Sequence, residues 1–346
     1  MWFTSRITAC FLIAIIAAFI PLRFHETKSC KSCNIPGISF YLTPDYGIAA
    51  ARLPNGSSVA IAKIEGNQAY KTFMRHEEFV PWPKELMPLL PTCPSPSLVD
   101  KWLWGYLDNC PEADVAAVGP LLRGLEAAVE SYLGNTICFV DTASPLGAKK
   151  YWHQQSIINE GLHQIGLTKA SGISWSPGKL AMVSHGMQKP SEDQKLVLVI
   201  DNSHYGYNLG IFLVEDYGLI IDLQRHHHIH SESGEPSRSS PSLQHALEEL
   251  LEPPFGPFLG EDIPNHIEEV VLHGDNILDI EFGKALEAVL DAQLISKAHR
   301  HQPVDAAVLG LAEETFRIVN RPFFETRRKA PFGCCWKSKE KGCPRE

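Results

Sequence analysis

The hydrophobic and polar positions of this chain alternate between short apolar runs and longer amphipathic segments. The clearest apolar run is Leu196–Asp201 (LVLVID), and after a turn-rich stretch two further short runs follow, Ile211–Val214 and Leu219–Asp222. Short apolar runs bounded by turn residues are typical of buried strands. The segment is therefore predicted to form part of a sheet, with the carboxylate of Asp201 at the end of its first strand.

The same pattern predicts strands and helices along the rest of the chain. The other expected strands are Ile38–Leu42, Gly47–Leu53, Ser58–Ile64, Thr136–Val140 and Ile267–Leu272. The expected helices are Pro111–Leu133, Gln154–Ile165, Gly178–His185, Leu243–Leu251, Phe282–Leu294 and Val304–Val319. No internal repeat is apparent. Strands that alternate with helices in this way indicate a layered α/β fold.

The segment Ile7–Leu22 differs from the rest because it is uncharged and mostly apolar. As a helix it would span about 24 Å, slightly short of the roughly 30 Å hydrocarbon core of a bilayer. It can be interpreted as a signal anchor, a signal peptide or a buried helix. Arg6 precedes it and no small-residue cleavage site follows it, which favours an uncleaved anchor. The main domain is then expected in the secretory lumen or outside the cell, and secreted if the segment is cleaved.

Composition narrows the class of partner. The 346 residues carry a net charge of -9, with 40 acidic and 31 basic side chains. This balance argues against nucleic acid, because phosphate binding needs a basic face. The basic cluster Arg327–Lys329 lies in the tail and is interpreted as a solvated run.

Nine cysteines bear on the compartment. They cluster near the ends and in loops, which suits disulfides in an oxidising lumen, and Cys30 and Cys33 are predicted to be disulfide cysteines. A redox-active or metal-binding Cys30–Cys33 pair is the alternative, but no second pair at zinc-ligand spacing supports it. Cys138 is set apart by its apolar neighbours. Asn55–Gly56–Ser57 is an N-glycosylation sequon if the domain is luminal.

Four segments carry a recognisable order. A strand at Gly37–Thr43 precedes a hairpin, a second strand runs into Asp201–Gly206 (DNSHYG), a third ends in Val270–Asp275 (VVLHGD), and a helix begins in Pro303–Ala312 (PVDAAVLGLA). Between Gly37 and Glu314 this order resembles the actin-like ATPase superfamily. The most similar member is the nucleotide-binding domain of the seventy-kilodalton heat-shock chaperones.

The resemblance implies an α/β, two-lobed actin-like ATPase architecture of ribonuclease H type, with a central cleft, after an N-terminal hydrophobic helix. It divides the chain into a signal anchor or signal peptide (1–22), a stem (23–36), two subdomains (37–190 and 191–320) and a Cys-containing basic tail (321–346). It also implies that ATP or ADP, with Mg²⁺, would lie in the cleft against Asp201, Asn202, Gly206, Gly274, Asp275 and Gly310.

The chain departs from the family pattern where phosphate would bind. Ser39 or Phe40 stands in place of the metal-holding aspartate of the first loop, and Tyr41 or Leu42 replaces a glycine. His204 and Tyr205 replace flexible residues of the second loop. Backbone N–H groups reach phosphate only where side chains are small, so side chains of this size fill the phosphate space. We therefore expect a membrane-tethered protein that binds nucleotide weakly or not at all and acts through protein contacts.

Two other functions are compatible with the sequence. One is an active ATPase or small-molecule kinase with a reorganised phosphate site. The other is metal binding: on a strand, alternate side chains share a face, so His226, His228 and His230 could hold Zn²⁺ or Cu²⁺. An exposed strand end is the simpler interpretation of these histidines.

Overall fold

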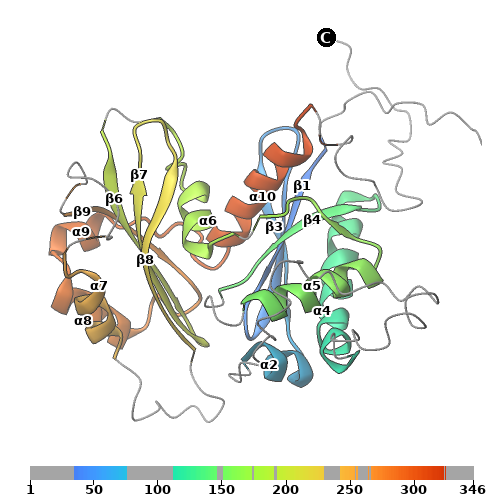
Figure 1. The fold of residues 1–346 in the computed structure, drawn as a ribbon, viewed down its shortest axis with the longest axis horizontal. Coiled ribbons are helices and arrows are strands. Elements are labelled where there is room, and N and C mark those ends of the chain that lie inside the picture. Colours follow the sequence, from blue (N-terminus) through green and yellow to red (C-terminus); the bar gives the residue numbers. More distant parts are fainter. Residues whose placement is uncertain are drawn as a thin grey trace, which may run out of the picture. The chain divides into compact units, whose positions relative to one another are not determined.

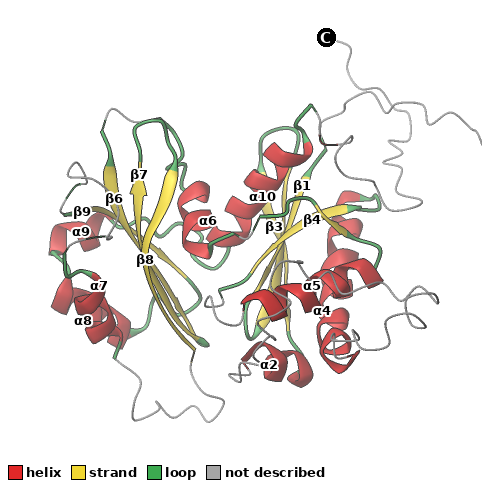
Figure 2. Cartoon of the chain, viewed as in Figure 1, coloured by secondary structure: helices red, strands yellow, loops and turns green. Residues whose placement is uncertain are grey.

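The computed structural model describes residues 35–75, 112–145, 151–173, 175–190, 193–229, 242–253, 255, 264, 266–322 and 324, except for the side chains of 151–153 and 227–229. All of these belong to one unit, Asn34–Ser338. Two mixed β-sheets are flanked by helices, which confirms the predicted α/β class (Figure 1, Figure 2).

The first sheet has five strands in the order β3-β2-β1-β4-β5. The strands are β1 (Gly37–Leu42), β2 (Tyr46–Arg52), β3 (Ser58–Glu65), β4 (Phe139–Ala143) and β5 (Thr168–Lys169). β1, β2 and β3 are antiparallel neighbours, whereas β4 pairs with β1 and β5 with β4 in parallel. β1 is buried along its whole length, as expected for a strand covered on both faces.

Alternate residues of β1 serve the two faces of this sheet. Ile38, Phe40 and Leu42 belong to a core that also holds side chains of three helices. Those helices are α2 (Gln68–Arg75), α4 (Glu112–Leu133) and α5 (Tyr151–Gln164). Tyr41 belongs instead to the core formed with α10 (Ala306–Val319). Burial on both faces explains why β1 reads as an almost continuous apolar run.

The second sheet has four strands in the order β8-β7-β6-β9. They are β6 (Lys195–Ser203), β7 (Gly206–Val214), β8 (Ile220–Ile229) and β9 (Ile267–His273). On one face, Val197 and Val199 pack in a core with side chains of α6 (Pro177–Ser184). On the other, Leu198 and Ile200 pack in a core that includes side chains of α7 (Leu243–Leu250) and α8 (Ile280–Val289), with α9 (Ala292–Lys297) at its edge.

The two sheets repeat one topology although the sequence shows no repeat. In each, the first strand pairs with the second and the second with the third in antiparallel fashion, and the first pairs in parallel with the fourth. In the first sheet β5 continues this parallel order. In the second, the corresponding place is taken by a single parallel bridge between Val271 and His299. The described chain is thus a duplicated five-strand plan, with the last strand of the second copy reduced to one residue.

Helices α6 and α10 connect the two sheets. α10 packs on β1 and β2 of the first sheet and also on α6, which packs on β6 and β7 of the second. As the sequence predicted, α6 begins at Ser176–Pro177, with Ser176 as the N-cap and Pro177 in the first turn. Gly186 follows the end of the helix, with φ 76°. At the crossing, a Cβ on Gly310 would lie 1.9 Å from the Leu180 backbone oxygen. Only a glycine at residue 310 allows this approach.

Several expected boundaries were wrong. β6 continues through Asp201 to Ser203, so Asp201 lies inside the strand rather than at its end. The stretch predicted to be turn-rich is mostly strand: Ser203 pairs with Gly206, which leaves only His204 and Tyr205 in the turn. The physical reason is pairing on both sides, because β6 and β8 hold β7 in register despite its turn-forming residues.

Other predicted features lie outside the described residues. These are the hydrophobic segment Ile7–Leu22, the cysteines Cys30 and Cys33, and the cluster Arg327–Lys329. Their expected roles stay predictions. Among the helices that the structure describes, none is both long enough and apolar enough to cross a bilayer.

Candidate functional site

Asp201 lies at the centre of a buried group of hydroxyls, here called the hydroxyl cluster (Asp201, Tyr41, Ser203 and Tyr205). The Ser203 hydroxyl donates to Oδ1 of Asp201 at 2.7 Å, and the Tyr205 hydroxyl donates to Oδ2 at 2.8 Å. The Tyr41 hydroxyl also donates to Oδ2, over 3.4 Å. Asp201 itself is 1% exposed. Both of its carboxylate oxygens therefore accept hydrogen bonds from the protein, away from solvent.

The local structure explains how these groups meet. Asp201 and Ser203 are two residues apart on β6, so their side chains share a face. Tyr205 occupies the turn that follows and bends back over the strand. Tyr41 comes from β1 of the other sheet, and its hydroxyl oxygen lies 3.4 Å from that of Tyr205. Ser39, also on β1, is fully buried, and its hydroxyl donates to the Val308 carbonyl of α10.

The electrostatics keep both tyrosines protonated. Burial raises the pKa of Tyr41 and of Tyr205 well above the usual value, and the charge of Asp201 raises each further. Neutral phenols remain hydrogen-bond donors, and hydrogen bonds to a charged acceptor are each worth about 1.5–3 kcal/mol. His273, which is paired with Asp201 across β6 and β9, has its pKa lowered by burial. The cluster therefore holds one carboxylate within neutral groups.

Gly274 packs directly against this part of β6. Its φ is +108°, and a Cβ there would lie 2.2 Å from the Asn202 backbone oxygen and 2.6 Å from Oδ1 of Asp201. Asn202 is also engaged: its side-chain amide donates to the Asn276 carbonyl at 2.7 Å. The structure therefore brings Asp201, Asn202 and Gly274 together, as predicted for a ligand site. Their close contacts, however, are with other residues of the protein.

Asp275 links the two sheets. Its Oδ1 accepts the His204 backbone N–H at 3.0 Å, and its Oδ2 lies 3.6 Å from Nζ of Lys63 on β3. The same Lys63 amine lies 3.7 Å from the centre of the Tyr46 ring. Burial, and then the charge of Asp275, raise the pKa of Tyr46. Tyr46 is 3% exposed, so its aromatic side chain is buried close to Asp275.

The remaining glycines assigned to a ligand site have structural positions. Gly206 is buried at the start of β7, with φ 147° directly after the turn. Gly310 lies at the crossing of α6 and α10, where the helix backbones approach closely. The backbone conformation at Gly206 and the close helix contact at Gly310 each require a glycine, whether or not a ligand binds.

The histidine run was expected to share a strand face, and β8 does extend through Ile229. His226 is partly buried, while the side chain of His228 and all of His230 lie outside the described residues. Within the described part, no three His, Cys, Asp or Glu side chains are placed to hold a metal ion.

A different set of histidines meets at the end of α6. The rings of His185 and His299 are 5.5 Å apart, and Nε2 of His185 is buried without a hydrogen-bond partner in the described structure. Burial, and then the nearby His299, His273 and His301, lower the pKa of His185 to about 4. His299 is held beside β9 by its bridge to Val271, far along the chain from His185. No local sequence pattern could therefore have predicted that the two histidines meet.

Sequence reasoning also missed a buried acid. Asp141 is fully buried in β4, and its Oδ1 accepts both the backbone N–H and the hydroxyl of Ser171, at 3.0 and 2.8 Å. Thr315 of α10 donates to its other oxygen over 3.5 Å. The strand was expected to end at Val140, which left Asp141 looking like a loop residue. It ties β4 to neighbouring segments and is a structural group.

Two features bear on maturation. Asn55 is exposed at the β2–β3 turn, where its side-chain oxygen accepts both the backbone N–H and the hydroxyl of Ser57, at 3.0 and 2.7 Å. Cys138 lies in apolar surroundings, as expected, and is disulfide-bonded to a partner outside the described residues. Cys138 packs in a core with Phe139 and Phe324.

Comparison of the chain with protein-family models and with curated proteins finds no match.

Proposed function

We propose that this chain is a degenerate actin-like ATPase-fold protein, related to the heat-shock chaperone nucleotide-binding domain, that does not hydrolyse ATP and acts through protein contacts. Its fold assignment is supported by the duplicated sheet topology and by the two helices, α6 and α10, that connect the copies. The order of sequence segments supports the same family. The proposal treats the place between the two first strands as the former nucleotide site.

The observation that carries the proposal is the hydroxyl cluster. Phosphoryl transfer depends on positioned metal ions and on space for phosphate against the backbone. Asp201 is almost fully buried, and both of its oxygens already accept hydrogen bonds, from Ser203 and from the two tyrosines. In the proposed alignment, Tyr41 or Leu42 stands where the family pattern has glycine. These residues do not fit Mg²⁺ with a nucleotide, so we assign no catalytic step to them.

The proposed setting is a membrane-tethered domain in an oxidising compartment. Ile7–Leu22 supplies the predicted anchor, and the disulfide at Cys138 is consistent with secretory oxidation. The exposed Asn55–Gly56–Ser57 turn is a suitable acceptor for N-glycosylation. A protein partner is the expected ligand of such a domain.

The test is ATP hydrolysis by the purified full-length protein with Mg²⁺, compared with an Asp201→Asn variant and a no-enzyme control. We expect both proteins to release phosphate at the background rate. Phosphate release well above background that disappears in Asp201→Asn would identify a working ATPase or kinase and overturn the proposal. A heat-shock chaperone ATPase assayed alongside confirms that the conditions support turnover.

A further inference from the structure

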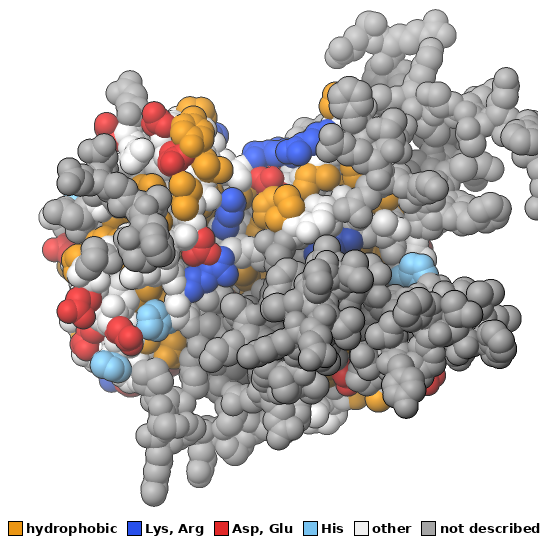
Figure 3. Space-filling view, in the orientation of Figure 1, with side chains coloured by type: hydrophobic (Ala, Val, Ile, Leu, Met, Phe, Trp, Pro, Cys, Tyr) orange, Lys and Arg blue, Asp and Glu red, His pale blue; other side chains and the backbone are white. Residues whose placement is uncertain are grey.

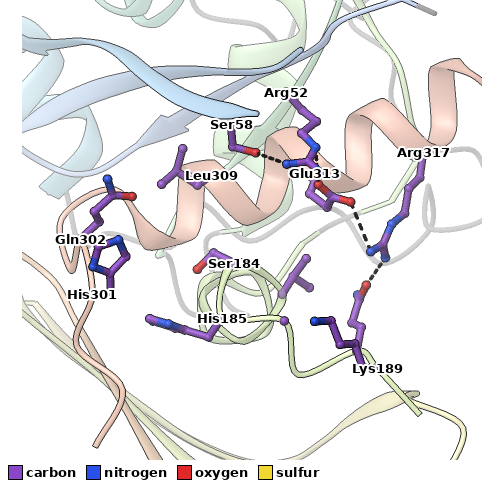
Figure 4. Close-up of a pocket in the computed structure, with 13 residues that line it drawn as sticks. Arg52, Ser58, Ser184, His185, Lys189, His301, Gln302, Leu309, Glu313 and Arg317 are labelled. Atoms are coloured by element: carbon purple, nitrogen blue, oxygen red, sulfur yellow. Dashed lines mark hydrogen bonds and ion pairs between the residues drawn. The ribbon is translucent and has the colours of Figure 1, made fainter. Parts of the chain in front are cut away.

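A separate cavity lies between α6 and α10, on residues that the hydroxyl cluster does not use (Figure 4). Its volume is about 370 Å³, which falls at the small end of the range of ligand pockets. The walls come from the end of α6 and the following turn, from one face of α10, and from the facing ends of β2 and β3. Polar residues of the lining include Arg52, His185, Gln188, Lys189, Glu313 and Arg317.

The cavity carries an excess of positive charge. Its lining includes three cations, Arg52, Lys189 and Arg317, and one anion, Glu313. Glu314, behind the lining, pairs with Arg317, so the two carboxylates leave one positive charge unbalanced. This excess occurs in a chain whose net charge is -9. Figure 3 shows Lys and Arg side chains gathered over the region of α6 and α10. A concave site of one sign concentrates ligands of the opposite sign.

One carboxylate serves two guanidinium groups in this cavity. Nε of Arg52 lies 2.7 Å from one oxygen of Glu313, and Nη2 of Arg317 lies 3.4 Å from the other. Arg317 also pairs with Glu314, behind the lining, and donates to the side-chain oxygen of Gln188. The guanidinium groups thus still have donors to offer, because each carries five N–H groups in a planar fork.

Lys189 is the group most available to a ligand. It is exposed, and within the described structure it forms no ion pair, yet its side chain folds back toward the turn after α6. A Cβ on Gly186 would lie 3.9 Å from its Nζ atom. His185 adds a buried Nε2 without a partner close to the same turn. The cavity therefore has more hydrogen-bond donors and positive charges than acceptors and negative charges.

We propose that this cavity binds a small organic anion that bears carboxylate or phosphate groups, held by Lys189 and Arg317. Both side chains lie at the accessible edge, so they can turn toward a ligand without disturbing the core. The ligand would touch α6, α10 and the β2–β3 pair at once. Because α10 packs on the first sheet and α6 on the second, binding stabilises the packing between the two sheets. The inference does not depend on the fate of the former nucleotide site.

The experiment is isothermal titration of the full-length protein with citrate and, separately, with inorganic pyrophosphate, at constant ionic strength set by sodium chloride. We expect saturable binding at one site for at least one probe. The preferred probe distinguishes a carboxylate ligand from a phosphate ligand. The combined Lys189→Gln and Arg317→Gln variant should bind at least tenfold more weakly. Lys284→Gln, which removes an exposed cation of α8 far along the chain from the cavity, should bind as the wild type does.

A second variant tests the sign of the charge argument. Glu313→Gln removes the one acidic group among the described lining residues, so it should tighten binding of the preferred probe. Thermal unfolding of each variant shows whether it is folded before titration. The proposal is overturned if neither probe binds saturably, if Glu313→Gln weakens binding in a folded protein, or if Lys284→Gln reduces affinity as much as the cavity variants do.

Discussion

The hydroxyl cluster makes a quantitative prediction for Tyr205→Phe. The substitution removes one buried hydroxyl that donates to Asp201 at 2.8 Å and leaves the ring in place. The carboxylate oxygen then keeps only the 3.4 Å interaction with Tyr41. Because Phe has nearly the same shape, the loss is the hydrogen bond itself rather than a cavity. A buried hydrogen bond to a charged group contributes about 1.5–3 kcal/mol, so the free energy of unfolding should fall by about that amount.

Urea unfolding at neutral pH, followed by intrinsic fluorescence, measures this difference. Tyr217→Phe is the matched control, because Tyr217 is 63% exposed and its hydroxyl has no partner in the described structure. It should change the free energy of unfolding by less than about 0.5 kcal/mol. Tyr41→Phe should fall between the two, since its hydrogen bond to Asp201 is longer.

A double-mutant cycle attributes the effect to the cluster. Tyr205→Phe in an Asp201→Asn background should cost less than in the wild type, with a coupling energy of about 1 kcal/mol or more. The reasoning would be refuted if Tyr205→Phe matched Tyr217→Phe, or if the cycle showed no coupling. Either result would mean that Asp201 is not held by the phenol hydroxyl.

Three further predictions address other parts of the structure. Gly310→Ala should destabilise the fold by more than about 2 kcal/mol in urea unfolding, because its Cβ would meet the α6 backbone, whereas Gly283→Ala, with open space around it, should stabilise by about 0.5–1 kcal/mol. His185 has a folded pKa of about 4, below its unfolded value, so stability should be lost as pH falls from about 6.5 to 4, by about 1–2 kcal/mol given its partial exposure, and His185→Gln should flatten that pH profile. Expression in a glycosylating host should give an endoglycosidase-sensitive gel shift that Asn55→Gln abolishes; an unshifted wild type would contradict luminal placement.

The elements with a clear apolar pattern were predictable from sequence. β1 and β9 and helices α4 and α10 were expected within a few residues of their observed bounds, because their apolar periodicity reflects burial. α6 was also located, by the Ser176–Pro177 start and the Gly186 stop. Local chemistry determines these features, so a local pattern detects them.

Elements held mainly by their neighbours were missed. β5 is two residues long and exists through its pairing with β4. α2 is only eight residues long and mostly polar, and its apolar face consists of Tyr70, Phe73 and Met74 alone, so its periodic signal is short. The expected helix Phe282–Leu294 is broken into α8 and α9 because Leu290 adopts an extended backbone and Asp291 caps a new helix. In these cases the structure depends on tertiary contacts or on the backbone angles of one residue, which the apolar periodicity of the sequence does not report.

The candidate site was foreseen in its parts but not in its arrangement. The sequence predicts that Tyr41 and Tyr205 fill space for phosphate and that Asp201 remains as a carboxylate for a metal. The structure joins these residues by hydrogen bonds between positions 160 residues apart in sequence. No local pattern reports that contact, because it depends on how the two sheets pack through α6 and α10. Lys63 and Asp275 meet for the same reason.

We propose that the place between β1 and β6, where a nucleotide would bind in an actin-like ATPase, is closed by the protein's own side chains. Equilibrium titration of Mg·ATP and Mg·ADP into the purified protein, followed by thermal unfolding, tests it most directly. A ligand at a hundred times its dissociation constant would stabilise the fold by about 2.7 kcal/mol. We predict no saturable heat and no rise in unfolding temperature at millimolar nucleotide. Saturable Mg²⁺-dependent binding at micromolar nucleotide, lost in Asp201→Asn, would contradict the account.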